Sequence, residues 1–377
     1  MKMKKISIIT VLNTVNYGSA LQTFATQKFF EDKGFETEFV DYWRKDQTTA
    51  ARIERIKKDK KSSLKQWIKK PLRDYLEIKS IKASEPVFRG FIKDKIKLTP
   101  RTYSSFEELK ADCPVADVYA TGSDQMWNSG WNQGIERSFF LDYAPEDKKK
   151  LAYATSIGKT SFDDEEAAEI IPLIKKYDLI TLREQSAVDL LAKYDIDASL
   201  VLDPTLMLNK DTWSSYLPEV KMDKKYLLVY QLHNEHDNAN FDEAVKSIAK
   251  EKNLEIVRIT YSYSDLKIGK KIVLPQVFEF LSLIKNAEFI VTDSFHGTAF
   301  SINFNKQMAI IYPKKFSTRM DNILSLTGLS ERRYTSADKI GKWNNVIDYE
   351  PVNKILDAKR SEINNRIDEW CENGINM

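Results

Sequence analysis

His296 is one of only three histidines in the 377-residue chain, and its position in the sequence suggests chemistry. In EFIVTDSFHGTAFSINF, residues 288–304, the run FIVT predicts a buried parallel strand and GTAFSINF predicts the helix that follows it. His296 would start this helix, with Asp293 or Ser294 as its cap. The helix dipole favours a neutral imidazole there, which can act as base or donor near neutral pH. A histidine satisfied by local backbone would explain the position equally well.

Two further groups of polar residues follow predicted strands and could contact a sugar. The first, NTVNYGSALQ, contains Asn16, Tyr17, Gly18 and Ser19. Gly18 would let the backbone turn into a helix whose free N–H groups hold an anion or a sugar hydroxyl. A plain capped helix, with Ser19 as one cap, accounts for this loop as well. The segment lacks a full GxGxxG pattern, so it does not predict a dinucleotide site.

The second group is GSDQMWNSGWNQG, which carries Asp124, Gln125, Trp127 and Asn128. Tryptophan faces interleaved with amides suit the apolar faces and hydroxyl rims of sugars. The alternative is a loop whose tryptophans only fill the wall of a cleft.

Cationic side chains follow two other predicted strands. Arg183, after LITL, could bind a phosphate or carboxylate through two parallel hydrogen bonds, while Glu184 could cap the next helix. Lys314, Lys315 and Arg319 come just past QMAIIYP. These three cations would form an anion pocket if they pointed inward.

A metal site is not expected. His233 and His236 in HNEHDN have a spacing that suits a metal, but loop histidines without further ligands are usually polar surface. The two cysteines, Cys113 and Cys371, belong to no metal or redox spacing, which makes a reducing cytosol the default compartment.

Apolar strands that alternate with amphipathic helices predict an α/β fold with two doubly wound Rossmann-like domains facing a cleft. In such sheets ligands lie beyond the carboxyl ends of the strands. We expect an N-terminal domain at residues 1–205 with a basic helical insertion at 44–100, and a C-terminal domain at 206–350. We expect the helix in 351–377 to pack back across the junction.

The composition of the chain limits the kinds of partner that it could bind. The chain is 42% hydrophobic and 30% charged, and no apolar run approaches the roughly 18 residues that cross a bilayer. From residue 44 to 82, 14 Lys and Arg stand against 5 Asp and Glu. This block predicts a solvated helix at a groove edge or, alternatively, an interfacial helix held to anionic lipid or to a diphosphate-bearing substrate. Nucleic acid is not expected, because the rest of the chain shows no matching basic face.

Six segments together resemble the polysaccharide pyruvyl transferase family. They occur in the family's order and spacing over roughly residues 5–330: NTVNYGSALQ, ATGSDQMWN, LREQSAV, LVLDPTLML, VTDSFHGTAFS and STRMDNIL. The resemblance implies a fold like that of GT-B glycosyltransferases. It also implies transfer of the pyruvyl unit of phosphoenolpyruvate to a sugar of a surface glycan, as a cyclic ketal.

By this resemblance, His296 matches the catalytic histidine and Arg183 an arginine of the active-site cleft. Donor binding would use Arg183, Ser294, Phe295, Gly297, Lys314, Lys315 and Arg319 in the C-terminal domain and at the cleft. Acceptor binding would use Asn16, Tyr17, Gly18, Ser19, Asp124, Gln125, Trp127 and Asn128 in the N-terminal domain. Many members have an arginine two residues before the histidine, where this chain has Ser294.

We therefore expect a cytoplasmic, metal-independent enzyme without a cofactor, in which phosphoenolpyruvate is the donor. The acceptor would be a glycan precursor, lipid-linked at the inner membrane face. One alternative is a GT-B glycosyltransferase that uses a nucleotide sugar. Another is a non-catalytic sugar-binding protein that keeps the cleft.

Overall fold

The computed structural model of the chain describes residues 3–58, 64–236, 240–314, 318–335, 338 and 340–375. It divides into two compact units. Unit 1 comprises Met1–Gln47, Phe91–Leu208 and Leu356–Met377, and unit 2 comprises Thr48–Gly90 and Asn209–Ile355. Residues 48–90 of the predicted insertion therefore group with unit 2, whereas the sequence places them in the N-terminal domain. The sequence predicts the domain junction near residue 205, and in the structure the second unit begins after Leu208.

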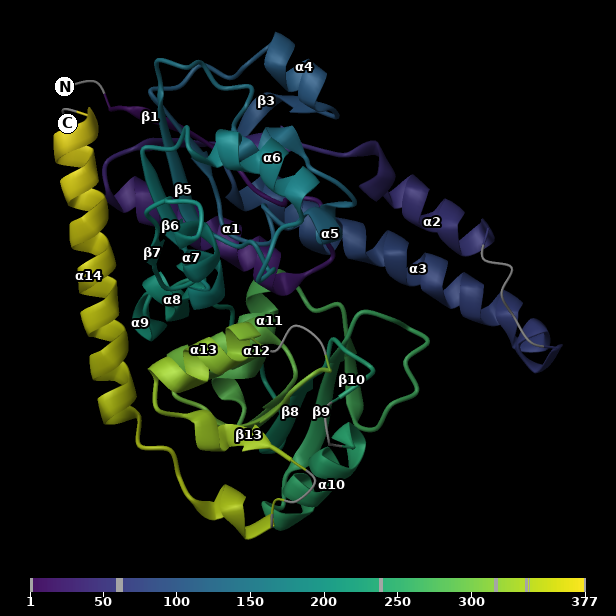
Figure 1. Cartoon of the computed structure of the whole chain (residues 1–377). Coiled ribbons are helices and arrows are strands. Elements are labelled where there is room, and N and C mark those ends of the chain that lie inside the picture. Colours follow the sequence, from purple (N-terminus) through teal and green to yellow (C-terminus); the bar gives the residue numbers. More distant parts are fainter. Residues whose placement is uncertain are drawn as a thin grey trace. The chain divides into compact units, whose positions relative to one another are not determined.

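Unit 1 is built on a seven-stranded sheet in which every neighbouring pair of strands is parallel (Figure 1). The strand order is β3-β2-β1-β4-β5-β6-β7. The strands are β1 Lys5–Ile9, β2 Glu36–Tyr42, β3 Leu98–Tyr103, β4 Val118–Thr121, β5 Lys149–Thr155, β6 Leu179–Leu182 and β7 Ser199–Leu200. The helices between them are α1 Tyr17–Asp32, α4 Phe106–Ala111, α5 Ser129–Asn132, α6 Asp164–Ile174, α7 Gln185–Ala192 and α8 Pro204–Met207.

Unit 2 repeats this plan with a six-stranded parallel sheet, in the order β10-β9-β8-β11-β12-β13. The strands are β8 Tyr226–Tyr230, β9 Glu255–Thr260, β10 Lys270–Val273, β11 Phe289–Thr292, β12 Gln307–Ile311 and β13 Arg333–Tyr334. The helices are α9 Lys210–Ser214, α10 Phe241–Glu251, α11 Val277–Asn286, α12 Phe295–Asn303 and α13 Thr318–Leu326.

Three further helices come from the basic block and from the end of the described chain. Helices α2 Thr49–Lys58 and α3 Leu64–Lys95 come from the basic block, and α14 Tyr349–Ile375 ends the described chain. In unit 1, the guanidinium of Arg360 on α14 donates to the carbonyl of Leu206, and Lys33 pairs with Asp368 at 2.7 Å. These contacts fix the second half of α14 on unit 1.

The central strands are buried on both faces, because helices cover both sides of each sheet. All five residues of β8 and all four of β11 are buried. Strands β11, β6 and β12 lie in the runs FIVT, LITL and QMAIIYP, which follow the sequence prediction, and α12 begins at Phe295. Both sheets therefore provide rigid edges on which loop residues can be placed.

Candidate functional site

Each sheet has one point where the strand order reverses, and some of the predicted site residues follow the strands next to it. In unit 1 the reversal lies between β1 and β4, where Ile9 pairs with Thr121 at the carboxyl ends. In unit 2 it lies between β8 and β11, where Tyr230 pairs with Thr292. Loops that leave neighbouring strands in opposite directions open a crevice there, and ligands of doubly wound sheets occupy it. We therefore describe one candidate site in each unit.

Asp124 is the centre of the site in unit 1. Its carboxylate accepts hydrogen bonds from Ser19 Oγ at 2.5 Å and from Arg183 Nη2 at 3.2 Å, and thus joins α1, β4 and β6 across the reversal point. The backbone N–H of Gln125 donates to the same carboxylate. Asp124 has a φ of 86°, which is costly for a residue with a side chain. Such strain persists where the surroundings over-determine it, as at functional sites.

Arg183 is buried, and two carboxylates hold its guanidinium. Nη1 donates to Asp203 Oδ2 at 2.6 Å and to Ser123 Oγ at 3.1 Å, while Nη2 donates to Asp124. Burial alone would lower the pKa of Arg183, but the charges of Asp203 and Asp124 outweigh it and raise that pKa. A donor phosphate would compete with these two carboxylates for the guanidinium, because both of its Nη atoms donate to them. Donor binding by Arg183 thus remains a prediction, and its contacts favour a supporting role for Asp124.

Glu184 adds a third carboxylate to the same edge of the sheet. It accepts hydrogen bonds from Ser156 Oγ and from the N–H of Gly158 and, contrary to the sequence interpretation, its side chain does not cap α7. Three carboxylates, from Asp124, Glu184 and Asp203, thus surround the single guanidinium of Arg183. An edge of this composition suits the hydroxyl groups of a sugar better than an anion.

The first turn of α1 is capped by Asn16, not by Ser19. Asn16 Oδ1 accepts the N–H groups of Gly18 at 2.8 Å and Ser19 at 3.3 Å. These two donors are therefore occupied, and Tyr17 is fully buried. What the helix start offers at the reversal point is the hydroxyl of Ser19, which is directed at Asp124.

The prediction that the face of Trp127 contacts a sugar is wrong, because the indole is 1% exposed. Its ring stacks on Phe140 at 5.6 Å, its edge meets Tyr177 at 5.2 Å, and Nε1 donates to the carbonyl of Phe139. Burial in the core satisfies both the apolar faces and the N–H of tryptophan. The sequence showed the residue type but could not show the direction of the ring.

Gln125 and Asn128 are held by each other and by Gly158. Asn128 Nδ2 donates to Gln125 Oε1 at 2.7 Å, and Asn128 Oδ1 caps α5 through Trp131. A Cβ at Gly158, where φ is 63°, would lie 2.2 Å from Gln125 Oε1 and 2.5 Å from Asn128 Nδ2. The loop after β4 therefore packs tightly against the loop after β5. This packing fixes Asp124 between them.

His296 lies in the first turn of α12 and is 7% exposed. Ser294 is the N-cap, because its Oγ accepts the N–H of Gly297 at 3.2 Å. Gly297 has no room for a side chain, since a Cβ would approach Thr292 Oγ1 to 2.4 Å. The tight contact with β11 fixes the start of the helix, and with it the imidazole of His296. The rings of Phe295 and His296 meet edge to face at 5.1 Å.

Asp293, the other predicted cap, instead binds the loop that follows β8. Its fully buried carboxylate accepts the backbone N–H groups of Leu232 at 2.7 Å and His233 at 2.9 Å, and it contacts His236 Nε2 at 2.8 Å. All three histidines of the chain thus belong to one edge of unit 2. The sequence interpretation of His233 and His236 as polar surface misses this, because it treats the loop apart from β11.

The three cations predicted beyond β12 do not all lie in the same kind of place. The guanidinium of Arg319 on α13 lies 5.3 Å from the ring of Phe295, and α12 and α13 pack side by side in unit 2 (Figure 1). Lys314 is exposed and lies 3.6 Å from Glu235. Lys315 lies outside the described residues. Within the part of the chain that the structure describes, Arg319 is the predicted cation nearest to the helix that carries His296.

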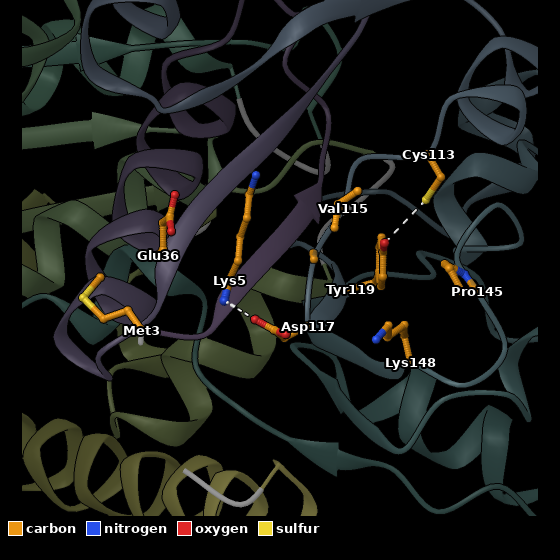
Figure 2. A pocket seen from close by; sticks show the side chains of 10 residues that line it. Met3, Lys5, Glu36, Cys113, Val115, Asp117, Tyr119, Pro145 and Lys148 are labelled. Carbon is orange, nitrogen blue, oxygen red and sulfur yellow. Dashed lines mark hydrogen bonds between the residues drawn. The ribbon is translucent and has the colours of Figure 1, made fainter. Parts of the chain in front are cut away.

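A cavity of about 330 Å³ opens elsewhere in unit 1, at the amino ends of β1 and β4 (Figure 2). Lys5 and Asp117 line it, joined by a hydrogen bond from the Lys5 N–H, and so do Cys113 and Tyr119. Ligands of doubly wound sheets bind at the opposite edge. None of the lining residues is among those that the sequence predicts for a site.

Among the side chains of the described residues, no group of three or more His, Cys, Asp and Glu is placed to hold a metal ion. His236 Nε2 is directed at the carboxylate of Asp293, in a geometry that suits a hydrogen bond.

Solved structures show the class of fold. S. aureus MnaA, in a co-structure with UDP, is 15% identical and covers 100% of this chain and 98% of its own, with a TM-score of 0.52. A putative UDP-N-acetylglucosamine 2-epimerase from Listeria monocytogenes is 12% identical, covers 96% and 97%, and has a TM-score of 0.47. The glycosyltransferase SnogD from Streptomyces nogalater is 9% identical, covers 96% and 95%, and has a TM-score of 0.41. With its two parallel sheets, the chain has a GT-B-like fold of two Rossmann-like units.

A family model for polysaccharide pyruvyl transferases matches residues 16–315, most of the chain, and the chain belongs to that family. It is thus a transferase that moves a pyruvyl group onto a polysaccharide. No curated protein matches the chain.

Proposed function

We propose that the protein transfers the pyruvyl unit of phosphoenolpyruvate to two hydroxyls of one sugar in a surface-polysaccharide precursor. Family membership supports pyruvyl transfer, and the position of His296 carries the chemical part of the proposal. A nearly buried imidazole in the first turn of α12, beside Phe295 and near Arg319, sits where unit 2 would receive an anionic ligand.

The reaction adds one proton to the methylene carbon of phosphoenolpyruvate and removes one proton from each of two sugar hydroxyls. The methylene of phosphoenolpyruvate takes up a proton and becomes a methyl group, and a sugar hydroxyl adds to the adjacent carbon. A second hydroxyl then displaces phosphate from that carbon, which closes the ketal. One hydroxyl proton balances the new methyl C–H bond and the other leaves with inorganic phosphate. One positioned group of suitable pKa can serve both as acid and as base, and we assign these steps to His296.

In this proposal unit 2 holds the donor and unit 1 holds the acceptor. Donor contacts are assigned to the first turn of α12, namely Ser294, Phe295 and Gly297, and to the cations Lys314, Lys315 and Arg319. Acceptor contacts are assigned to Ser19 and Asp124, with Asn16, Tyr17, Gly18, Gln125 and Asn128 shaping the loops around them. The carboxylate of Asp124 can accept a hydrogen bond from a sugar hydroxyl, because strain and three donors already fix its orientation.

The decisive experiment is incubation of the full chain with phosphoenolpyruvate and candidate lipid-linked saccharides, with and without a chelator. We expect inorganic phosphate to be released and the saccharide to gain the pyruvyl mass in mass spectrometry, equally in both conditions. Release of a nucleoside diphosphate from a nucleotide sugar would instead identify a glycosyltransferase. Saccharide binding without turnover of phosphoenolpyruvate would identify a sugar-binding protein.

We also propose peripheral contact with anionic lipid at the inner membrane face, through the basic block at residues 44–82. Side chains of Leu72 and Tyr75 on α3 are 65% and 62% exposed, next to cationic residues of the same helix. Among the described residues, no helix combines the length and the apolar character that a bilayer crossing requires.

This contact predicts that vesicle binding depends on charge. Changing Lys57, Lys58, Lys60 and Lys61 to glutamine should weaken binding to anionic vesicles by at least about tenfold in a sedimentation assay, because each cation near such a surface contributes about 1 kcal/mol. Lys60 and Lys61 lie outside the described residues. Equal binding of the unmodified protein to neutral and anionic vesicles would refute the contact.

A further inference from the structure

The loop of residues 231–236, which follows β8, is held by contacts with three other segments of unit 2. From β11, Asp293 binds two of its N–H groups and the ring of His236. On the other side of the loop, His236 forms an antiparallel bridge with Pro313, and the N–H of Lys314 donates to the carbonyl of Glu235. The loop is thus tied to the carboxyl ends of β11 and β12, the strands that flank the start of α12.

A buried arginine supports the same loop from β9. Arg258 is 1% exposed and its Nη1 donates to Gln231 Oε1 at 2.6 Å, while Nη2 pairs with Asp242 at 2.6 Å. Gln231 Nε2 in turn donates to the carbonyl of His233 at 2.9 Å. A buried charge is expensive unless it is paired and hydrogen-bonded, and here the arrangement fixes the backbone on which His233 stands.

The ring of His236 is nearly inaccessible and has a positioning role. Its side chain is 4% exposed, Nε2 is bound to Asp293, and its ring lies 5.0 Å from that of Phe241 on α10. His233 is held through its backbone instead, because its N–H donates to Asp293 and its carbonyl accepts from Gln231, and the residue is partly exposed. The loop thus carries one histidine whose side chain is bound to Asp293 and one whose backbone is bound to it.

His233 interacts electrostatically with the charges of the proposed donor site. Burial lowers the pKa of His233; Asp293 opposes this, while His236 and Arg319 lower the pKa further. The backbone N–H of His233 donates to Asp293, two residues before Phe295, whose ring the guanidinium of Arg319 contacts. The exposed pair Lys314 and Glu235 completes the charged groups that flank this loop.

We propose that His233 is a specificity-determining residue that binds the anionic group of the donor together with Arg319, and that Asp293 and His236 hold it there. This inference rests on the proposed function and names a part of the donor site that no predicted residue supplies. At neutral pH His233 offers a neutral N–H to a phosphate or carboxylate oxygen. At lower pH it takes up a proton, and the hydrogen bond becomes charge-assisted.

The sign of the pH effect follows from the lowered pKa. Below its pKa, His233 adds a positive charge that favours the anion, and this gain is lost as pH rises through that value. The KM for phosphoenolpyruvate of the unmodified protein, divided by that of His233→Gln, should therefore fall as pH falls from 8 to 5.5. The ratio removes the titration of the donor itself, which is common to both proteins.

The test measures KM and kcat for phosphoenolpyruvate by phosphate release in full-length variants. His233→Gln should raise KM by about tenfold or more at pH 6, the loss expected for a hydrogen bond to a charged group, with kcat nearly unchanged. His236→Phe should raise KM similarly, and His236→Gln, whose amide can still donate to Asp293, should restore much of it. Lys267→Gln removes a nearby charge that is bonded to Asn234 and should leave KM unchanged.

The double variant His233→Gln with His236→Phe should be no worse than the more impaired single variant, because both changes remove one interaction. Additive losses, or a KM ratio that does not change with pH, would overturn the inference. If the unmodified protein releases no phosphate from phosphoenolpyruvate, the proposed function itself fails. Active unmodified protein with an unaffected His233→Gln variant would refute only the role of His233.

Discussion

Replacement of His296 by glutamine is expected to lower kcat for pyruvyl transfer by about 10²- to 10⁴-fold, the usual contribution of a positioned acid or base. Glutamine keeps the size and hydrogen-bonding capacity of the side chain but cannot exchange a proton near neutral pH. Because Ser294 caps α12 and Gly297 packs against Thr292, the helix start should persist in the variant. The KM for phosphoenolpyruvate should change far less than kcat.

Phosphate release and the pyruvyl mass gain of the acceptor provide the measurement. Ser301→Ala, on the same helix, is the matched control, since this buried hydroxyl donates to the carbonyl of Gly297 within α12 and Ser301 has no assigned role in the reaction. Its kcat should stay close to that of the unmodified protein. A His296→Gln variant that retains most of its kcat would show that another group moves the proton.

Replacement of Arg183 by methionine should destabilise unit 1 by about 3–5 kcal/mol, the cost of leaving a buried charge without its partner. The carboxylate of Asp203 is fully buried, and it accepts one of its hydrogen bonds from Arg183. Hydrogen exchange of the amides in β4, β5 and β6 would measure the loss of stability in the strands next to Arg183. Exchange in unit 2 should be largely unaffected.

Two comparisons make this result interpretable. Arg101→Met breaks an exposed pair with Asp112 and should leave the exchange of these amides nearly unchanged, because exposed ion pairs contribute little to stability. Adding Asp203→Asn to Arg183→Met removes the charge that was left behind and should recover part of the loss. If Arg183→Met kept normal exchange but raised the KM for phosphoenolpyruvate, Arg183 would be a donor ligand, as the sequence resemblance implies.

The sequence predicts the parallel sheets well because their central strands are continuous apolar runs between amphipathic helices. It misses β3, β10 and β13, which lie at the sheet edges and are mostly exposed or half-buried, so no apolar run marks them. A strand that buries little of either face carries neither a continuous apolar run nor a regular alternation. Central strands were therefore predictable from their burial, whereas three of the four edge strands were not.

The candidate site was predictable only in part. The sequence places His296 and Asp124 after buried strands, and the structure has both there. The bonds from Asp293 to His233 and His236 join residues 57 to 61 positions apart, and no local pattern shows them. The reversal of strand order between β8 and β11 brings these residues together, so the topology was the missing information.

The division of the chain has a consequence for engineering. Unit 1 is assembled from three separate segments, the last of which begins at Leu356. An exchange of the amino-terminal half between two family members, cut after Leu208, would thus join unit 1, which we propose holds the acceptor, to a foreign second half of α14. Arg360 and Asp368, which bind Leu206 and Lys33, would then come from the wrong parent. Chimeras that aim to transfer acceptor choice should carry the carboxyl-terminal helix along with the first half.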